Sequence, residues 1–198
     1  MSIPKKILKH LEKNKIKFEA VPHRTVYTAY DLAQTLGEKL EGIAKTLLIK
    51  IELPKVEKVA PRYYVVAVPA SYRIDLKAVN KLLKTAKSQL TGEKEMKLLG
   101  MLPGAATPFV TLYENVGLVI DQALAKTSKV LVRAESITDS LRVNMKDLIR
   151  SERALVAKIG LKVKMPSAPK AKKQTKKPKK KFATKAAFMK SLKAKKRK

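Results

Sequence analysis

The sequence predicts an α+β fold: a mixed, mostly antiparallel central sheet, partly barrel-like, with helices around it. Segments with the 3.6-residue period of amphipathic helices are interspersed with short runs of β-branched and aromatic residues. The connections between them are of hairpin length, which favours this fold class. After residue 164 both periodicities stop and lysine dominates, which predicts a C-terminal tail without a packed core.

The first part of the chain predicts a helix, a strand and a second helix. The first helix is expected over Pro4–Lys15, where a proline opens the segment and apolar residues follow at helical spacing. A short strand is expected over Lys17–Val21, because the next residue is proline. The second helix is expected over Thr28–Leu36, since Thr28 can cap its start and Gly37 suits the position just past its end.

The middle of the chain predicts an antiparallel strand pair followed by two helices. Strands are expected over Lys45–Leu53 and Arg62–Val68, joined by the polar segment Pro54–Pro61. Helices are expected from Asp75, a good N-cap residue, to about Lys84, and over Thr91–Gly100. In the last part of the ordered region, a closing helix is expected over Lys146–Lys158. Four short strands are expected before it, over Phe109–Tyr113, Gly117–Asp121, Lys129–Arg133 and Leu141–Met145.

The charge is extreme and unevenly distributed. The formal net charge is +29, and residues 161–198 carry 17 of the 45 Lys and Arg residues but none of the 16 Asp and Glu residues. We therefore divide the chain into a folded domain, 1–160, and a basic, largely disordered tail, 161–198. A polycation of this kind is typical of RNA binding through the phosphates. An anionic membrane surface is the competing partner, and a short helix over 182–193 that folds on a partner is a further interpretation.

The composition indicates a cytoplasmic protein. There is no cysteine, the N-terminus lacks the apolar core of a signal peptide, and no apolar run reaches the roughly 18 residues of a membrane span. We expect no metal and no cofactor, because His10 and His23 are the only histidines and neither has metal-ligand spacing. His10 is expected to face solvent and His23 to lie in a loop. Gly37, Gly42 and Lys45 approach a phosphate-binding loop, but the lysine comes two residues too late and a strand follows it.

Two stretches carry the functional hypothesis: Ile43–Ile49, where Lys45 opens an apolar run, and Gly104–Phe109, a loop bounded by glycine and proline. Together with Val65–Pro69 and Ile74–Lys77 between them, they follow an order that resembles the aminoacyl-tRNA deacylase family of the YbaK/ProX type. The same family supplies the editing domain of bacterial prolyl-tRNA synthetases. The resemblance covers about residues 4–157 and excludes the tail.

The resemblance implies hydrolysis of the ester between a wrong amino acid and the 3′ end of a tRNA. It implies a catalytic role for Lys45 near the terminal nucleotide, and an amino-acid pocket shaped by Gly104 and Pro108. The substrate-binding residues expected with them are Gly104, Ala105, Thr107, Pro108, Tyr27 and Thr46. Such an ester is already reactive, so positioning and charge stabilisation suffice and no nucleophilic triad is needed.

One segment departs from the family pattern. Many relatives carry a glycine pair after the strand that matches Lys129–Arg133, whereas this chain has Ala134–Asp139. We expect a free-standing trans-editing enzyme whose partners are mischarged tRNA and an aminoacyl-tRNA synthetase, with the tail on RNA phosphates and no membrane. The alternative is a non-catalytic RNA- or ribosome-binding protein that uses a deacylase-like fold and the basic tail.

Overall fold

The computed structural model describes residues 3–52 and 62–163. The helices are α1 Lys5–Lys13, α2 Ala29–Leu36, α3 Leu76–Leu82, α4 Glu93–Leu98, α5 Gln122–Ala125 and α6 Met145–Ser151, with single 3₁₀ turns at η1 Leu40–Gly42 and η2 Val110–Leu112. The strands are β1 Phe18–Pro22, β2 Ala44–Ile51, β3 Tyr63–Pro69, β4 Tyr72–Ile74, β5 Ser88–Leu90, β6 Val116–Asp121, β7 Lys129–Arg133, β8 Asp139–Asn144, β9 Leu155–Ala157 and β10 Gly160–Lys162.

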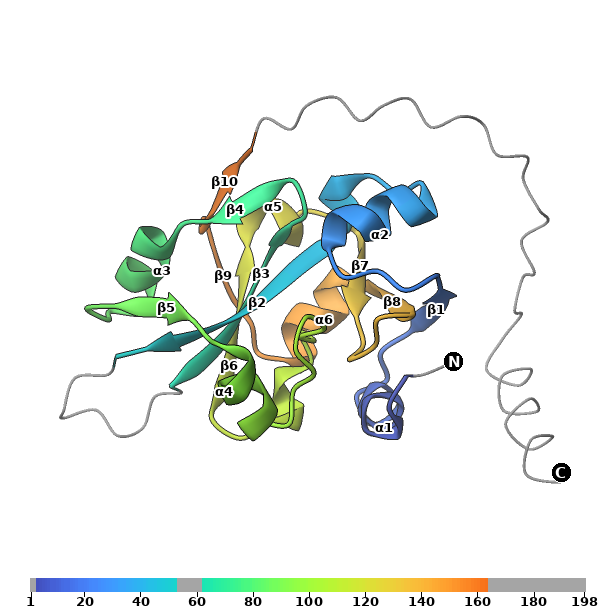
Figure 1. Cartoon of the computed structure of the whole chain (residues 1–198), viewed down its shortest axis with the longest axis horizontal. Helices are drawn as coiled ribbons and strands as arrows, with labels where there is room; N and C mark the ends of the chain where they lie inside the picture. The colour runs from blue at the N-terminus through green and yellow to red at the C-terminus, as the bar shows by residue number, and fades with distance from the viewer. Residues whose placement is uncertain (1–2, 53–61, 164–198) are drawn as a thin grey trace, which may run out of the picture. The chain divides into compact units, whose positions relative to one another are not determined.

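The strands form a five-stranded sheet in the order β5-β2-β3-β6-β9, a three-stranded sheet β1-β8-β7 and a two-stranded pair β10-β4 (Figure 1). In the large sheet β2 pairs antiparallel with β3 and β5, whereas β6 pairs parallel with β3 and β9. The predicted α+β class with a mixed sheet and surrounding helices is therefore confirmed. Its partly barrel-like character is not, because none of these sheets closes within the described residues.

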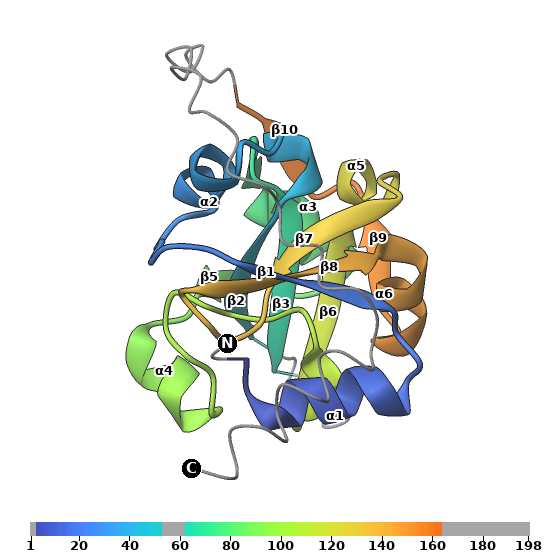
Figure 2. The ribbon, with the colours of Figure 1, turned by 90° about the vertical axis from the view of Figure 1, so that its right-hand side faces the viewer.

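The hydrophobic core lies where the two larger sheets meet the helices. Ala44, Leu48 and Val65 of the large sheet pack in one cluster with Val130 and Val132 of β7. Helix α1 adds Ile7 and Leu11 to this cluster, while α2 packs in a separate cluster with Ile43 and Leu131. In Figure 2, α1 and α2 accordingly lie on opposite sides of the sheet that contains β1, β7 and β8.

The predicted caps that define α2 and α3 are present. Thr28 Oγ1 accepts a hydrogen bond from the Asp31 N–H at 3.0 Å, and Gly37 ends α2 at φ 66°. Asp75 accepts from the N–H groups of Lys77 and Ala78 at the start of α3. The expected strand pair of β2 and β3 is also confirmed, with Lys45 opposite Val68.

Two predicted elements were wrong. Phe109–Tyr113 contains the 3₁₀ turn η2 instead of a strand, because its N–H groups bond within the segment: Tyr113 donates to the Val110 carbonyl at 2.9 Å. The closing helix ends at Ser151, and Leu155–Ala157 pairs with β6 as strand β9. A left-handed residue, Arg153 at φ 50°, stops the helix between them.

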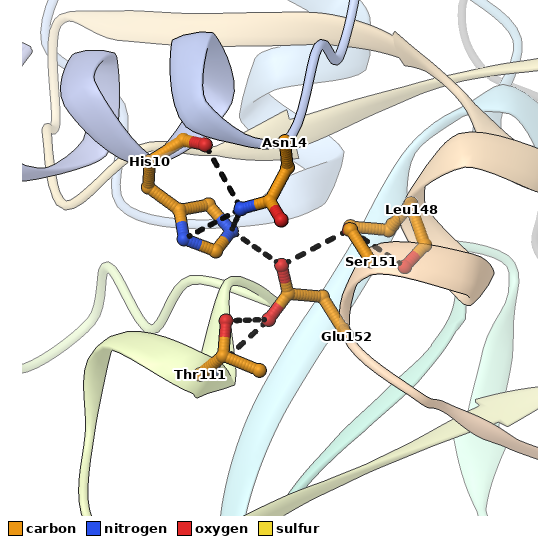
Figure 3. Close-up of polar contacts among 6 residues, drawn as sticks. All are labelled: His10, Asn14, Thr111, Leu148, Ser151 and Glu152. Atoms are coloured by element: carbon orange, nitrogen blue, oxygen red, sulfur yellow. Dashed lines mark hydrogen bonds and ion pairs between the residues drawn. The ribbon is translucent and has the colours of Figure 1, made fainter.

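His10 is buried, contrary to the expectation of a solvent-facing residue, because a buried carboxylate accepts its hydrogen bond (Figure 3). His10 Nε2 lies 2.6 Å from Glu152 Oε1, which also accepts from Ser151 Oγ at 3.1 Å. Glu152 Oε2 accepts from the backbone N–H and the hydroxyl of Thr111, both at 2.9 Å. This network joins α1, η2 and the end of α6.

Two predicted segments fall outside the described residues: the whole polar connection Pro54–Pro61 and nearly all of the basic tail. The first compact unit of the chain runs to Lys164. Strand β10, which crosses the predicted boundary at residue 160, pairs Gly160 with Ile74 and Lys162 with Tyr72. The N–H of Val163 then donates to the Ser71 carbonyl at 3.0 Å. No helix in the described part of the chain is long and apolar enough to cross a membrane.

Candidate functional site

Lys45 is the second residue of β2 and is half-buried. Its Nζ donates a hydrogen bond to the carbonyl oxygen of Tyr72 in β4. Burial of the ammonium lowers the pKa of Lys45 from its ordinary value, because the charged form loses hydration. The start of the strand thus presents a positioned cation whose proton is held less firmly than that of a surface lysine.

Thr46, the next residue, ties β2 to the predicted loop. Its Oγ1 donates to the Ala106 carbonyl oxygen at 2.6 Å. In the loop, Gly104 takes a left-handed φ of 73°, a conformation that costs glycine nothing but strains residues with a Cβ. The residues from Ala105 to Pro108 are all buried. The loop is therefore a backbone wall with almost no exposed side-chain chemistry, as its sequence indicates.

Lys45 and Thr46 lie on opposite faces of β2, since neighbouring residues in a strand alternate. Thr46 shares the face of Ala44 and Leu48, on which the loop packs through Ala106. Strand β5 pairs only with Ile49–Ile51, so within the described residues the first half of β2 has β3 as its strand partner. Beside the start of this strand lies β7, through the bridge between Ile43 and Leu131.

Arg133 is a candidate site residue that the sequence analysis missed. Ile43 and Leu131 form a parallel bridge, and Lys45 and Arg133 each follow two residues later, so both lie on the face that packs against α2. Arg133 is 6% exposed, and its guanidinium donates to the Val26 carbonyl at 3.1 Å. Burial lowers the pKa of Arg133, and the nearby charge of Asp31 opposes that shift. A lone arginine at the end of an apolar strand was the available signal.

The remaining predicted residues differ in their surroundings. Tyr27 is 71% exposed, and it follows Val26, whose carbonyl holds Arg133. The Thr107 hydroxyl is buried and has no hydrogen-bond partner among the described residues. In the segment Ala134–Asp139, Ser136 Oγ accepts from the N–H groups of Thr138 and Asp139 at 3.1 and 3.0 Å. Side-chain hydrogen bonds therefore shape this turn.

The arrangement suits charge stabilisation better than nucleophilic chemistry. Within residues 3–52 and 62–163, no group of three His, Asp or Glu side chains could hold a metal ion. The part of the site in view consists of one lysine, one buried arginine, a threonine hydroxyl and backbone groups. Such groups can orient an ester and stabilise negative charge that develops on its carbonyl oxygen.

A family model described as the aminoacyl-tRNA editing domain matches residues 23–151. Among curated proteins, the chain is 24% identical over 152 residues to the prolyl-tRNA editing protein ProX of Acetoanaerobium sticklandii. That match covers 75% of this chain and 89% of the relative.

Two solved structures share the fold. The hypothetical protein APE2540 superposes with a TM-score of 0.69 at 21% identity, over 79% of this chain and all of that one. A candidate trans-editing enzyme for prolyl-tRNA synthetase superposes with a TM-score of 0.66 at 20% identity, over 80% of this chain and 97% of that one. At these identities the superpositions establish the fold alone.

Proposed function

This chain belongs to the aminoacyl-tRNA editing domain family, and we propose that it is a trans-editing deacylase that hydrolyses the ester of mischarged aminoacyl-tRNA in the cytoplasm. Lys45 supplies the positive charge for the 3′-terminal nucleotide and for the oxyanion that forms as water attacks the ester carbonyl. The Gly104–Pro108 loop holds the aminoacyl group. Tyr27, Thr46 and Arg133 complete the substrate contacts.

The observation that carries this proposal is the junction at the start of β2. Lys45 is held by the Tyr72 carbonyl, and Thr46 holds the Ala106 carbonyl of the loop at 2.6 Å. Two adjacent residues of one strand therefore fix the position of the cation relative to the loop. An aminoacyl ester needs this combination of a fixed charge and a shaped wall, because its own reactivity supplies the rest of the driving force.

The names of the relatives direct the choice of substrate. ProX is a prolyl-tRNA editing protein, and one structural neighbour is described as a candidate trans-editing enzyme for prolyl-tRNA synthetase. We therefore propose that the substrate is proline-specific tRNA carrying an amino acid other than proline. A synthetase that releases or shares this tRNA is the corresponding protein partner.

The test is a deacylation assay with the full chain. Proline-specific tRNA is charged with proline or with a series of smaller and similar-sized amino acids, and release of the labelled amino acid is followed against buffer. We expect at least one mischarged species to be hydrolysed at least tenfold faster than in buffer, with correctly charged prolyl-tRNA spared. A series in which every species decays at the buffer rate would exclude the proposed function.

We further propose that the basic tail, which lies outside the described residues, adds affinity for RNA. A chain that ends at Lys164 keeps β10 and all the described site residues. We expect this truncation to leave kcat within about twofold and to raise KM about tenfold or more at low salt, because phosphate contacts are lost. The slope of log KM against log salt concentration should also become shallower. If removal of the tail abolishes kcat, the proposed role of the tail in affinity alone is wrong. That result would favour the alternative of a non-catalytic RNA- or ribosome-binding protein that works through its tail.

A further inference from the structure

Lys6, in the first turn of α1, contacts three residues that lie far from it in the sequence. Its Nζ is 2.8 Å from Glu135 Oε2 and donates to Tyr113 Oη at 3.3 Å and to the Gly100 carbonyl at 3.5 Å. The same Nζ lies 4.8 Å from the centroid of the Tyr113 ring. Lys6 precedes the range 23–151 that matches the editing family model, so the match assigns it no role.

The three partners of Lys6 belong to two segments of the proposed site, the Gly104–Pro108 loop with its flanks and the turn Ala134–Asp139. Gly100 and Tyr113 stand at the two ends of the segment that contains the Gly104–Pro108 loop. Glu135 belongs to the turn Ala134–Asp139 that follows β7. One ammonium group therefore holds both segments at a set separation.

Glu135 depends on this contact. Its side chain is 7% exposed, and its backbone takes a left-handed φ of 52°, which is unfavourable for a residue with a Cβ. One carboxylate oxygen, Oε2, meets Lys6, while Oε1 is buried without a hydrogen-bond partner among the described residues. A buried carboxylate in a strained turn needs a fixed counter-charge, and Lys6 supplies it.

The same turn is held from its other side by the site itself. The Arg133 guanidinium lies 3.5 Å from the Ser136 carbonyl and 3.1 Å from the Val26 carbonyl. The loop, in turn, is hydrogen-bonded to Thr46 through Ala106. A shift of Glu135 or Gly100 would thus be passed to Arg133 and Thr46, the neighbours of Lys45 in the site.

We propose that Lys6 is a positioning residue of the editing site: by joining Glu135 to both ends of the Gly100–Tyr113 segment, it sets the distance between the loop and the turn, and so the size of aminoacyl group that fits. This inference rests on the proposed deacylase function. It gives α1 a part in substrate selection, although α1 lies outside the matched family range.

The test compares Lys6→Met, Lys6→Arg and Glu135→Gln, with Lys9→Met as the matched control on the exposed face of α1. We measure kcat and KM for two mischarged tRNAs that differ in amino-acid size. Lys6→Met and Glu135→Gln should each lower kcat/KM for the better substrate about tenfold and change the ratio between the two substrates about threefold. Lys6→Arg should restore part of the loss, and Lys9→Met should match the wild type. An unchanged ratio in Lys6→Met and Glu135→Gln would overturn the proposal.

Amide hydrogen exchange provides a second readout that requires no substrate. Lys6→Met should speed exchange in residues 100–113 and 134–139 and leave β3 and β6 unchanged, which a general loss of stability would not do. If the wild type hydrolyses no aminoacyl-tRNA, the proposed function fails, and exchange alone then decides whether Lys6 holds the two segments. Unchanged exchange in both segments would overturn the role of Lys6 whatever the activity.

Discussion

Replacing Lys45 by methionine is expected to lower kcat/KM for mischarged tRNA by about 10²–10³-fold, which corresponds to roughly 3–4 kcal/mol of transition-state stabilisation. Methionine keeps the unbranched apolar stem of the side chain and removes only the charge. The hydrogen bond to the Tyr72 carbonyl is lost as well, but β4 remains paired to β10. The fold should therefore persist, and circular dichroism and the melting temperature check that it does.

Lys50→Met is the matched control, because Lys50 lies on the same strand and its Nζ pairs with Glu95 at 2.7 Å. Both members of that pair are partly exposed, so we expect activity to stay within about twofold and stability within about 1 kcal/mol of the wild type. If Lys45→Met retains wild-type kcat/KM, or if Lys50→Met loses as much activity, the assigned role of Lys45 is wrong.

The pH profile of the wild type tests the same role without a mutation. Burial lowers the pKa of Lys45, so the ammonium loses its proton at a lower pH than an exposed lysine does. If the charged form is the active one, kcat/KM falls as the pH rises through this lowered pKa, once spontaneous ester hydrolysis has been subtracted. In Lys45→Arg, any remaining activity should not show this fall, because a guanidinium keeps its proton.

The elements that the sequence predicted well carry their own local signals. Thr28, Gly37 and Asp75 mark helix ends by side-chain or backbone chemistry that acts within three residues, and each holds its predicted place. The pairing of β2 with β3 could be predicted because two runs of apolar, strand-forming residues follow each other with one polar segment between them. The candidate lysine and loop were proposed from their order in the chain, which resembles that of the family. The hydrogen bond from Thr46 to the Ala106 carbonyl that joins them could not, because it spans 60 residues.

Three other features were predicted wrongly or missed because their partners lie far away in the sequence. Leu155–Ala157 continues a helical pattern, but its parallel pairing with β6 decides its structure, and no local signal reveals that pairing. The arginine at the end of an apolar strand was a weak signal for Arg133, and only the bridge of Ile43 to Leu131 places this residue on the face of Lys45. His10 follows Ile7 by three residues and so shares the buried stripe of α1, but its polar ring argued for solvent.

Replacing Glu152 by alanine is expected to lower the free energy of unfolding by about 3–5 kcal/mol, the largest stability effect that we predict for a single residue. The side chain accepts hydrogen bonds from His10, Ser151 and Thr111 (Figure 3). Its removal leaves the buried ring of His10 without its carboxylate acceptor and breaks both bonds from Thr111, whereas Ser151 can still donate to the Leu148 carbonyl. Urea unfolding measures the loss, and Glu114→Ala, at an exposed position, serves as the control. Glu152→Gln should lower the free energy of unfolding by about 1–3 kcal/mol. The amide of glutamine keeps one acceptor oxygen, but its NH₂ group faces partners that are themselves hydrogen-bond donors.

A double-mutant cycle with His10→Ala separates the contact with α1 from the rest of the network. We expect a coupling energy of about 1–3 kcal/mol between His10 and Glu152, since their atoms are 2.6 Å apart in a buried position. His10 also contacts Phe109, with ring centroids 5.7 Å apart. A looser α1 therefore disturbs Phe109, the last residue of the Gly104–Phe109 stretch. Glu152→Ala should therefore raise KM for mischarged tRNA even at temperatures where the variant is folded. An additive cycle together with an unchanged KM would show that α1 is anchored to the core without this network.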